Sequence, residues 1–246
     1  MREGQRTIER WLPTLEFHIH SNEDVWKLAV AAIVARALQE RRRLTPSARP
    51  RLLVSGGSTP APVFRALSQS TLDWPHVDIA LVDERWLPST DPDSNAHLVR
   101  EHLLRGAARD ARFELLARPN RSIETAVSDA NLHAKHPADI VMLGMGDDGH
   151  TASLFPRMRD LNRALATPLA YIAVDASGCP GAGPWPRRIS LTPAGLAPAG
   201  VRMLLIRGQQ KRALLERVVK GTDPHEYPVR LAFTTPGAIL QVHWCA

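Results

Sequence analysis

The sequence has few of the residues that build disulfide scaffolds or metal modules. Only two of its 246 residues are cysteine, Cys179 and Cys245, and neither belongs to a Cys-x-x-Cys or a closely spaced His-Cys pattern. Small disulfide-dependent folds need more cysteines, and structural zinc sites need them in close pairs. The sequence therefore predicts a reducing, cytoplasmic compartment and no bound metal.

Long hydrophobic runs are absent as well. The longest apolar runs are far shorter than the roughly 20 residues that a helix needs to cross a membrane. The first six residues, Met1–Arg6, carry charges of both signs and are not followed by an apolar signal core. We therefore expect neither a membrane partner nor secretion.

Lysine is scarce, since it accounts for only four of the 31 basic residues, and the others are arginine. The formal net charge of +6 at pH 7 would suit a nucleic-acid-binding protein. However, no aromatic residues interleave with the basic ones, and an arginine-rich excess is equally typical of biased genome composition. We expect no nucleic-acid partner, and the positive charge favours an anionic small substrate.

What the chain does have is an alternation of strand-like and helix-like segments. Its 246 residues, 44% of them hydrophobic, suffice for a single α/β domain over residues 1–246. The alternation predicts a Rossmann-like three-layer sandwich, with helices on both faces of a mostly parallel sheet. Strands are expected over 15–20, 51–55, 77–82, 113–116, 138–143, 171–174, 188–192 and 202–206, and helices over 23–43, 60–67, 96–104, 122–135 and 209–220.

Two segments carry more detailed expectations. The helix over 23–43 can be capped by Ser21 or Asn22. Its apolar positions define the face that we predict to be buried, namely Val25, Leu28, Ala29, Ala32 and Ile33. Residues 175–186, rich in glycine and proline, form the least regular segment, which we expect to border the functional site.

The most informative segment is the turn over residues 143–156, Leu-Gly-Met-Gly-Asp-Asp-Gly-His-Thr-Ala-Ser-Leu-Phe-Pro. It follows a predicted buried strand, and open α/β sheets bind ligands at the carboxyl ends of their strands. Its glycines, Gly144, Gly146 and Gly149, permit positive φ and close approach of a ligand. The turn presents Asp148 and His150, whose imidazole can exchange protons near neutral pH. A glycine-rich turn with a surface histidine is the alternative.

A second strand-to-helix turn has the features of an anion site. It consists of Ser55, Gly56, Gly57, Ser58 and Thr59. The glycines expose backbone N–H groups, the hydroxyls add donors, and the following helix contributes the positive end of its dipole. The turn matches neither the P-loop nor the dinucleotide fingerprint, so we expect no nucleotide cofactor. A tight turn with a capping hydroxyl is the alternative.

Further charged residues lie where such a site could use them. Asp83 and Arg85 follow a predicted strand. Asp83 could transfer a proton or orient a sugar hydroxyl, and Arg85 could hold an oxyanion. Arg187 and Arg188 open another strand. Lys211 lies in the first turn of a helix, where the dipole disfavours a cation unless a phosphate is shared. The alternatives are that the carboxylates and the guanidinium at the strand end only pair with each other, and that Lys211 is a solvated surface residue.

Together these segments resemble the 6-phosphogluconolactonase family, which shares its fold with the glucosamine-6-phosphate deaminases. The resemblance covers about residues 16 to 231, and its specificity comes from the order of the motifs. They are Ser55–Pro60, Asp83–Arg85, Ser94–Asn95, Gly144–Pro156, Arg188–Thr192 and Gly208–Lys211. The chain departs from the family pattern at His243–Ala246, where many relatives have a tryptophan followed by an aspartate.

The resemblance implies hydrolysis of 6-phospho-D-glucono-1,5-lactone to 6-phospho-D-gluconate in the oxidative pentose phosphate pathway, without metal or cofactor. It implies that His150 is the general base and that Asp148 orients its imidazole. Asp83 and Arg85 would face the reacting end of the lactone. The implied phosphate contacts are Ser55, Gly56, Gly57, Ser58, Thr59, Arg188 and Lys211.

Two other functions are compatible with parts of this pattern. Deaminase-isomerases of the same fold typically have a glutamate shortly after the Asp-Gly-His, and this chain has none there. A sugar-phosphate-sensing regulator would need a DNA-binding segment, and residues 1–15 are too short for a helix-turn-helix. We therefore expect a lactonase that is a monomer or a weak homo-oligomer.

Overall fold

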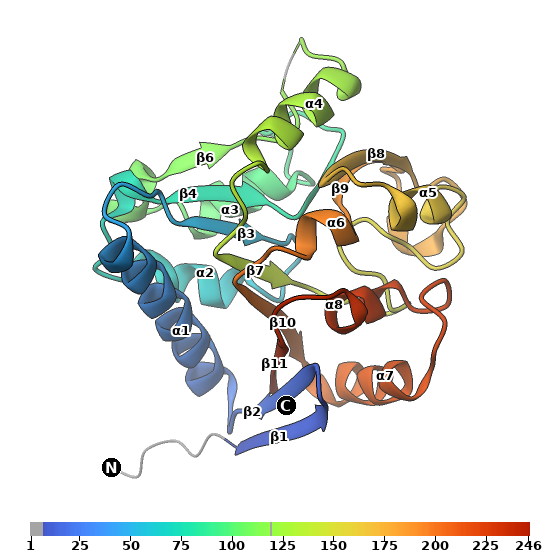
Figure 1. The fold of residues 1–246 in the computed structure, drawn as a ribbon, viewed down its shortest axis with the longest axis horizontal. Coiled ribbons are helices and arrows are strands. Elements are labelled where there is room, and N and C mark those ends of the chain that lie inside the picture. The colour runs from blue at the N-terminus through green and yellow to red at the C-terminus, as the bar shows by residue number, and fades with distance from the viewer. Residues whose placement is uncertain (1–6, 119) are drawn as a thin grey trace.

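The computed structural model describes residues 7–118 and 120–246. Within these ranges the main sheet has eight strands in the order β1-β2-β11-β10-β7-β3-β4-β6 (Figure 1). Neighbouring strands are parallel except for β1 and β2, which form an antiparallel pair. The strands are β1 (Thr7–Leu12), β2 (Leu15–Ile19), β3 (Arg51–Val54), β4 (Asp78–Leu81), β6 (Arg112–Glu114), β7 (Ile140–Leu143), β10 (Val201–Arg207) and β11 (Leu240–Cys245).

Helices cover both faces of this sheet. On one face α2 (Ala61–Ser68) packs between α1 (Glu23–Leu44) and α3 (Asn95–His102), whereas α7 (Gly208–Lys220) lies against β10 and β11 on the other (Figure 1). The remaining helices are α4 (Ile123–His133), α5 (Leu161–Ala166), α6 (Pro193–Leu196) and α8 (Leu231–Thr234). This layering confirms the predicted Rossmann-like architecture.

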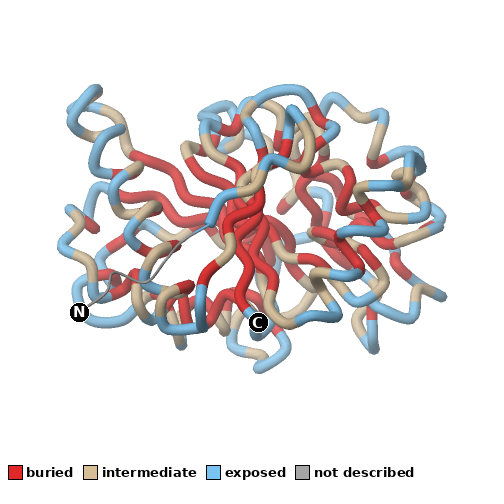
Figure 2. Tube along the Cα trace, turned by 90° about the horizontal axis from the view of Figure 1, so that it is seen from below, coloured by how far each residue is buried: buried red, intermediate tan, exposed pale blue. Residues whose placement is uncertain are grey.

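The centre of the sheet forms the core. Every residue of β3, β4 and β7 is buried, and Figure 2 shows that buried segments run through the middle of the molecule and exposed segments lie at its periphery. Strands that are covered on both faces lack the polar alternation of half-exposed strands. This explains why β7 is the continuous apolar run Ile-Val-Met-Leu.

A second, antiparallel sheet was not predicted. It has the order β5-β9-β8 and contains β5 (Asp83–Arg85), β8 (Tyr171–Asp175) and β9 (Arg187–Leu191). A single residue, Val82, separates β4 from β5, so the chain passes directly from the main sheet into the second one. Any site at the carboxyl end of β4 therefore has walls from both sheets.

The predicted buried face of α1 is wrong. The helix begins after Asn22, whose side chain accepts a hydrogen bond from Val25 N, so one of the two proposed caps is confirmed. Leu28 is 59% exposed and Ala32 is exposed, whereas the buried residues are Trp26, Val30, Ala31, Val34 and Leu38. The indole of Trp26 donates a hydrogen bond to the carbonyl of His243 in β11, and this contact orients the helix. Alanines on several sides of the helix hide that preference from the sequence pattern.

Three strands escaped the sequence analysis, namely β1, β5 and β11. In the part of the chain that the structure describes, no helix is long and apolar enough to cross a membrane. The expectation based on Met1–Arg6 lies outside the described residues, and the assignment of residues 1–246 to one domain stays a prediction.

Candidate active site

The candidate site lies where the direction of the chain through the sheet reverses. From β3 the chain continues toward β4, whereas from β7 it continues to strands on the other side, although β3 and β7 are neighbours. The crevice outside such a switch point is where open α/β sheets bind ligands. The turns that begin at Ser55 and Gly144 leave these two strands at that crevice.

A cavity of about 290 Å³ opens at this point and is lined by residues of both turns and of the second sheet. All but one of the predicted site residues line it: Ser55, Gly56, Gly57, Ser58, Thr59, Asp83, Arg85, His150, Arg188 and Lys211. The exception is Asp148, which contacts His150 from behind. The structure thus brings together residues that are more than 150 positions apart in the sequence.

His150 and Asp148 form a hydrogen-bonded pair. His150 Nδ1 lies 2.6 Å from Asp148 Oδ1, which also accepts a hydrogen bond from the backbone N of His150 at 3.0 Å. The carboxylate can only accept, so Nδ1 carries a proton, and in the neutral form of this imidazole the lone pair is on Nε2. The imidazole packs on the ring of Phe155, with the ring centroids 4.4 Å apart. Among the described residues no group hydrogen-bonds to Nε2, so this atom is available as a base.

The carboxyl group of Asp148 is a stable anionic partner. Burial alone would raise its pKa, but the hydrogen bonds and the charge of His150 outweigh burial and hold the pKa below its usual value. Asp148 therefore stays ionised at neutral pH. Such a carboxylate orients the imidazole and stabilises the imidazolium form when His150 takes up a proton.

Gly146 is required by the His150 side chain. A Cβ at position 146 would lie 2.0 Å from His150 Nδ1 and 2.7 Å from Asp148 Oδ1. The sequence predicts that Gly146 allows a ligand to come close to the backbone. In the structure it is the imidazole of His150 that comes close. Positive φ is confined to Gly149 among the glycines of this turn, at 83°.

The turn over residues 55–59 presents unused donors to the cavity. Pro60 stands at the N-cap position of α2, and no side chain caps this helix. The predicted alternative, in which a hydroxyl of the turn is consumed as a cap, is therefore wrong. Ser55 is 5% exposed, and among the described residues its Oγ has no hydrogen-bond partner. A buried hydroxyl that lacks a partner and lines a cavity is suited to an oxygen of a bound ligand.

Glu84 has a structural role that the sequence analysis missed. Its buried carboxylate accepts hydrogen bonds from Ser94 Oγ, from the backbone N of Asn95 and Ala96, and from the backbone N of Arg85. Burial raises the pKa of this carboxyl group, and the hydrogen bonds oppose that shift. Glu84 thus anchors the start of α3 and is not a member of the strand-end ion pair that the sequence left open.

Asn95 forms part of the cavity wall. Its Nδ2 donates a hydrogen bond to the carbonyl of Asp83 at 2.8 Å, and its side chain is buried. The side chain packs so closely on the 55–59 turn that a Cβ at Gly56 would lie 1.9 Å from Asn95 Oδ1. Asn95 therefore connects α3, β5 and this turn, whereas Ser94 is the N-cap of α3.

Arg188, and not Arg187, lines the cavity. Arg187 is exposed, whereas Arg188 is 5% exposed and donates from Nε to Trp185 O and from Nη2 to Ala182 O. These two carbonyls belong to residues 175–186, which border the site as expected. Burial lowers the pKa of Arg188, and the charge of Asp83 partly restores it. Asp83 is 6% exposed, and its Oδ2 accepts a hydrogen bond from Ser153 Oγ at 2.5 Å.

Lys211 is held at the rim of the cavity, and is not the solvated surface lysine of the alternative interpretation. Its Nζ donates to the carbonyl of Met145 at 2.6 Å and pairs with Asp147 Oδ1 at 2.8 Å. The side chain of Asp147 is 93% exposed, so this counter-ion can be displaced. Lys211, Arg85 and Arg188 supply three cations to one cavity, which suits an anionic ligand. Within residues 7–118 and 120–246, no group of three or more His, Cys, Asp or Glu residues could hold a metal ion.

The chain is similar to known 6-phosphogluconolactonases in sequence and in structure. Residues 21–244 match the family model described as glucosamine-6-phosphate isomerases/6-phosphogluconolactonase. The chain is 49% identical to a 6-phosphogluconolactonase of Xylella fastidiosa, over 96% of this chain and 100% of the relative, and 41% identical to one of Pseudomonas aeruginosa, over 87% and 88%. Its structure resembles that of a 6-phosphogluconolactonase from Shewanella baltica, with a TM-score of 0.86 and 33% identity over 95% and 98% of the two chains.

Proposed function

The chain belongs to the glucosamine-6-phosphate isomerase/6-phosphogluconolactonase family, and we propose that it hydrolyses 6-phospho-D-glucono-1,5-lactone to 6-phospho-D-gluconate. One observation carries this proposal beyond the likeness. A histidine whose Nδ1 is held by an ionised carboxylate faces a cavity that contains three cations and an unused phosphate-type cradle. A general base beside an anion site is what hydrolysis of a phosphorylated lactone requires.

The phosphate is the part of the substrate that the site holds most firmly. The backbone amides of the 55–59 turn, the hydroxyl of Ser55 and the ammonium of Lys211 bind its oxygens, and Lys211 exchanges Asp147 for the phosphate. Arg188 supplies a further cation from the second sheet. Fixing the phosphate positions the lactone carbonyl beside His150, and such positioning contributes several kcal/mol to catalysis.

His150 then acts as a general base. Its Nε2 takes a proton from a water molecule while the water oxygen attacks the lactone carbonyl carbon, and Asp148 stabilises the resulting imidazolium. The guanidinium of Arg85 stabilises the oxyanion of the tetrahedral intermediate. When this intermediate collapses, the bond to the ring oxygen breaks, and the imidazolium returns its proton to that oxygen. Asp83 orients a sugar hydroxyl at the reacting end.

The cavity lining favours hydrolysis over deamination. No glutamate is among the described residues that line the cavity, and Glu84, the nearest along β5, is occupied with the start of α3. The ring-opening glutamate that is typical of the deaminases therefore has no counterpart here. Residues 7–12 form strand β1 and so provide no helix of a DNA-binding motif.

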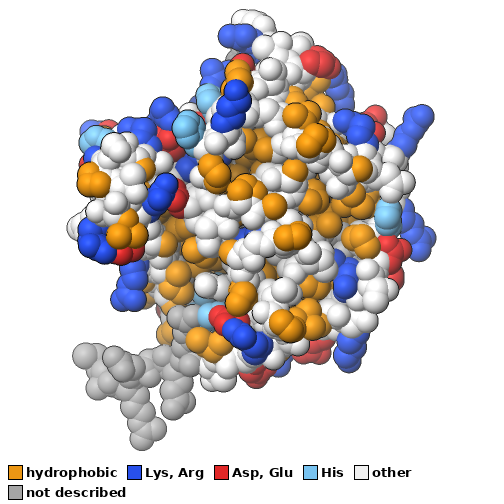
Figure 3. All heavy atoms as spheres, viewed as in Figure 1, with side chains coloured by type: hydrophobic (Ala, Val, Ile, Leu, Met, Phe, Trp, Pro, Cys, Tyr) orange, Lys and Arg blue, Asp and Glu red, His pale blue; other side chains and the backbone are white. Residues whose placement is uncertain are grey.

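The remaining expectations concern the setting of this reaction. On the face shown in Figure 3, basic and acidic side chains are interspersed and form no continuous basic stripe. We propose a cytoplasmic enzyme of the oxidative pentose phosphate pathway that is a monomer or a weak homo-oligomer, has no nucleic-acid partner and needs no cofactor.

A direct test compares two substrates with the same purified protein. The lactone is generated in situ by oxidation of glucose 6-phosphate, and 6-phosphogluconate formation is measured above the spontaneous rate with a coupled dehydrogenase. Ammonia release from glucosamine 6-phosphate is measured in parallel. We expect acceleration of lactone hydrolysis alone. Ammonia release without lactone hydrolysis would establish the deaminase, and neither activity would favour the sensing module.

A further inference from the structure

Ser153 occupies a central position between the two sheets. It lies three residues after His150 in the same turn, and it is completely buried. The sequence analysis gave it no role, because serine is common in turns. Its contacts, however, reach β5 and β9, which are far away in the sequence.

The hydroxyl of Ser153 connects two groups of opposite charge. Ser153 Oγ donates a hydrogen bond to Asp83 Oδ2 at 2.5 Å and accepts one from Arg188 Nη1 at 3.4 Å. A hydroxyl has one proton to donate and lone pairs to accept with, so it can do both at once. Asp83 and Arg188 form no direct ion pair among the described residues. The serine therefore lies between a carboxylate and a guanidinium that would otherwise attract each other.

We propose that Ser153 is a positioning residue, which holds Asp83 and Arg188 apart and in register with His150. The inference rests on the proposed function, because it assigns these two groups to binding the same lactone. Without the hydroxyl, Asp83 and Arg188 would move into direct contact, as charged groups in a buried site do. Both would then turn away from the substrate, while His150 and Asp148 would keep their own hydrogen bond.

The backbone of Ser153 is anchored independently of its hydroxyl. Ser153 N donates a hydrogen bond to Ser190 Oγ at 3.1 Å, and the flanking Thr151 and Leu154 form a β-bridge. Removal of the hydroxyl alone therefore leaves the turn in place. This separation makes Ser153→Ala a test of the hydroxyl and not of the fold.

The test measures kcat and KM for the lactone in a double-mutant cycle. Ser153→Ala should reduce kcat/KM roughly tenfold, the effect of losing a hydrogen bond to a charged group. In an Asp83→Ala background the same substitution should have much less effect, because one of its two partners is already absent. The control is Ser68→Ala, since Ser68 is another buried serine, its hydroxyl bonds within α2, and its kinetic constants should match the wild type.

The outcomes separate this inference from the function on which it rests. If the wild type fails to hydrolyse the lactone, the proposed function is wrong. If the wild type is active and Ser153→Ala matches it, or if the losses from Ser153→Ala and Asp83→Ala multiply independently, the positioning role is wrong. Should Ser153→Ala unfold, Ser153→Cys keeps a weak donor at similar volume. Activity between wild type and Asp83→Ala supports the inference, and wild-type activity contradicts it.

Discussion

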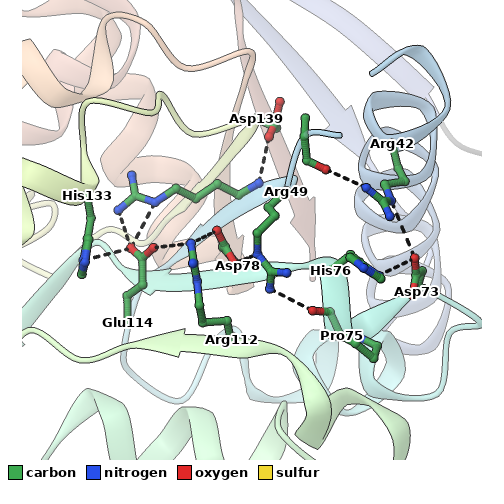
Figure 4. Close-up of polar contacts among 12 residues, drawn as sticks. Arg42, Arg49, Asp73, Pro75, His76, Asp78, Arg112, Glu114, His133 and Asp139 are labelled. Atoms are coloured by element: carbon green, nitrogen blue, oxygen red, sulfur yellow. Dashed lines mark hydrogen bonds and ion pairs between the residues drawn. The ribbon is translucent and has the colours of Figure 1, made fainter. Parts of the chain in front are cut away.

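The two ends of the parallel sheet carry the same kinds of side chain but use them differently. At the carboxyl end, His150, Asp83, Arg85 and Arg188 surround a cavity. At the amino end, Figure 4 shows another cluster of aspartate, glutamate, arginine and histidine around the starts of β3, β4 and β6. A count of charged residues would not distinguish the two ends.

At the amino end the buried charges are paired with one another. Arg51 donates from Nε and Nη2 to Glu114 Oε2, at 3.1 and 2.7 Å. Asp78 pairs with Arg49 on one oxygen and with Arg112 on the other (Figure 4). The buried carboxylates of Asp78 and Glu114 are thus paired with arginines in or just before neighbouring strands and connect the amino ends of these strands.

At the carboxyl end several groups remain available to a ligand, although Asp83 and Arg188 also bond within the protein. Ser55 Oγ has no hydrogen-bond partner among the described residues, His150 bonds to Asp148 through Nδ1, which leaves Nε2 for a ligand, and the counter-ion of Lys211 is exposed. Hydrogen-bonding capacity that is left open is therefore a better indicator of a site than charge.

The largest expected effect is on catalysis at the carboxyl end. His150→Ala should reduce kcat for the lactone at least ~10²-fold, as expected for the loss of a general base, with an unchanged melting temperature. The matched control is His133→Ala, because His133 belongs to the amino-end cluster, 3.8 Å from Glu114. Near-normal turnover of a folded His150→Ala protein would contradict the proposed mechanism.

The next effect is on stability at the amino end. Glu114→Gln should reduce the free energy of unfolding by about 3 kcal/mol, because it leaves the buried guanidinium of Arg51 without its carboxylate. Urea denaturation measures this loss, while kcat and KM of the folded variant should not change. Asp73→Asn, which removes an exposed partner of Arg42 and His76, serves as the control and should change little. A changed kcat in Glu114→Gln would show that the two ends are coupled.

A smaller effect is expected on substrate binding. Lys211→Ala should raise KM for the lactone about tenfold and leave kcat within about twofold, because it removes a phosphate contact but not the base. Lys220→Ala, on the same helix but outside the cavity, is the control. An unchanged KM would show that the ammonium of Lys211 only anchors the Met145 carbonyl.

The smallest effect concerns the exposed counter-ion. Asp147→Asn should lower KM about twofold, because the phosphate no longer competes with a carboxylate for Lys211, and exposed ion pairs are weak. The difference from wild type should shrink in high salt, which screens exposed charges. A raised KM would mean that Asp147 assists binding. It would then no longer count as a displaceable partner.

The site was predictable where it depends on strand ends. The carboxyl ends of parallel strands meet at one edge, so the turns after β3 and β7 and the residues after β4 had to converge once the α/β pattern was recognised. The contacts of Ser153 and Asn95 were not predictable, since they depend on how the second, antiparallel sheet packs on the first. The prediction of the buried face of α1 was wrong for a similar reason, because the hydrogen-bond partner of Trp26 is His243, more than 200 residues away in the sequence.

The contact between Gly56 and Asn95 also limits how this sequence can vary. A side chain at position 56 has no room while the amide of Asn95 lies 1.9 Å from where its Cβ would be. A relative with a larger residue at 56 must therefore have a smaller one at 95, and would lose the hydrogen bond to the carbonyl of Asp83. The two positions should consequently covary during evolution.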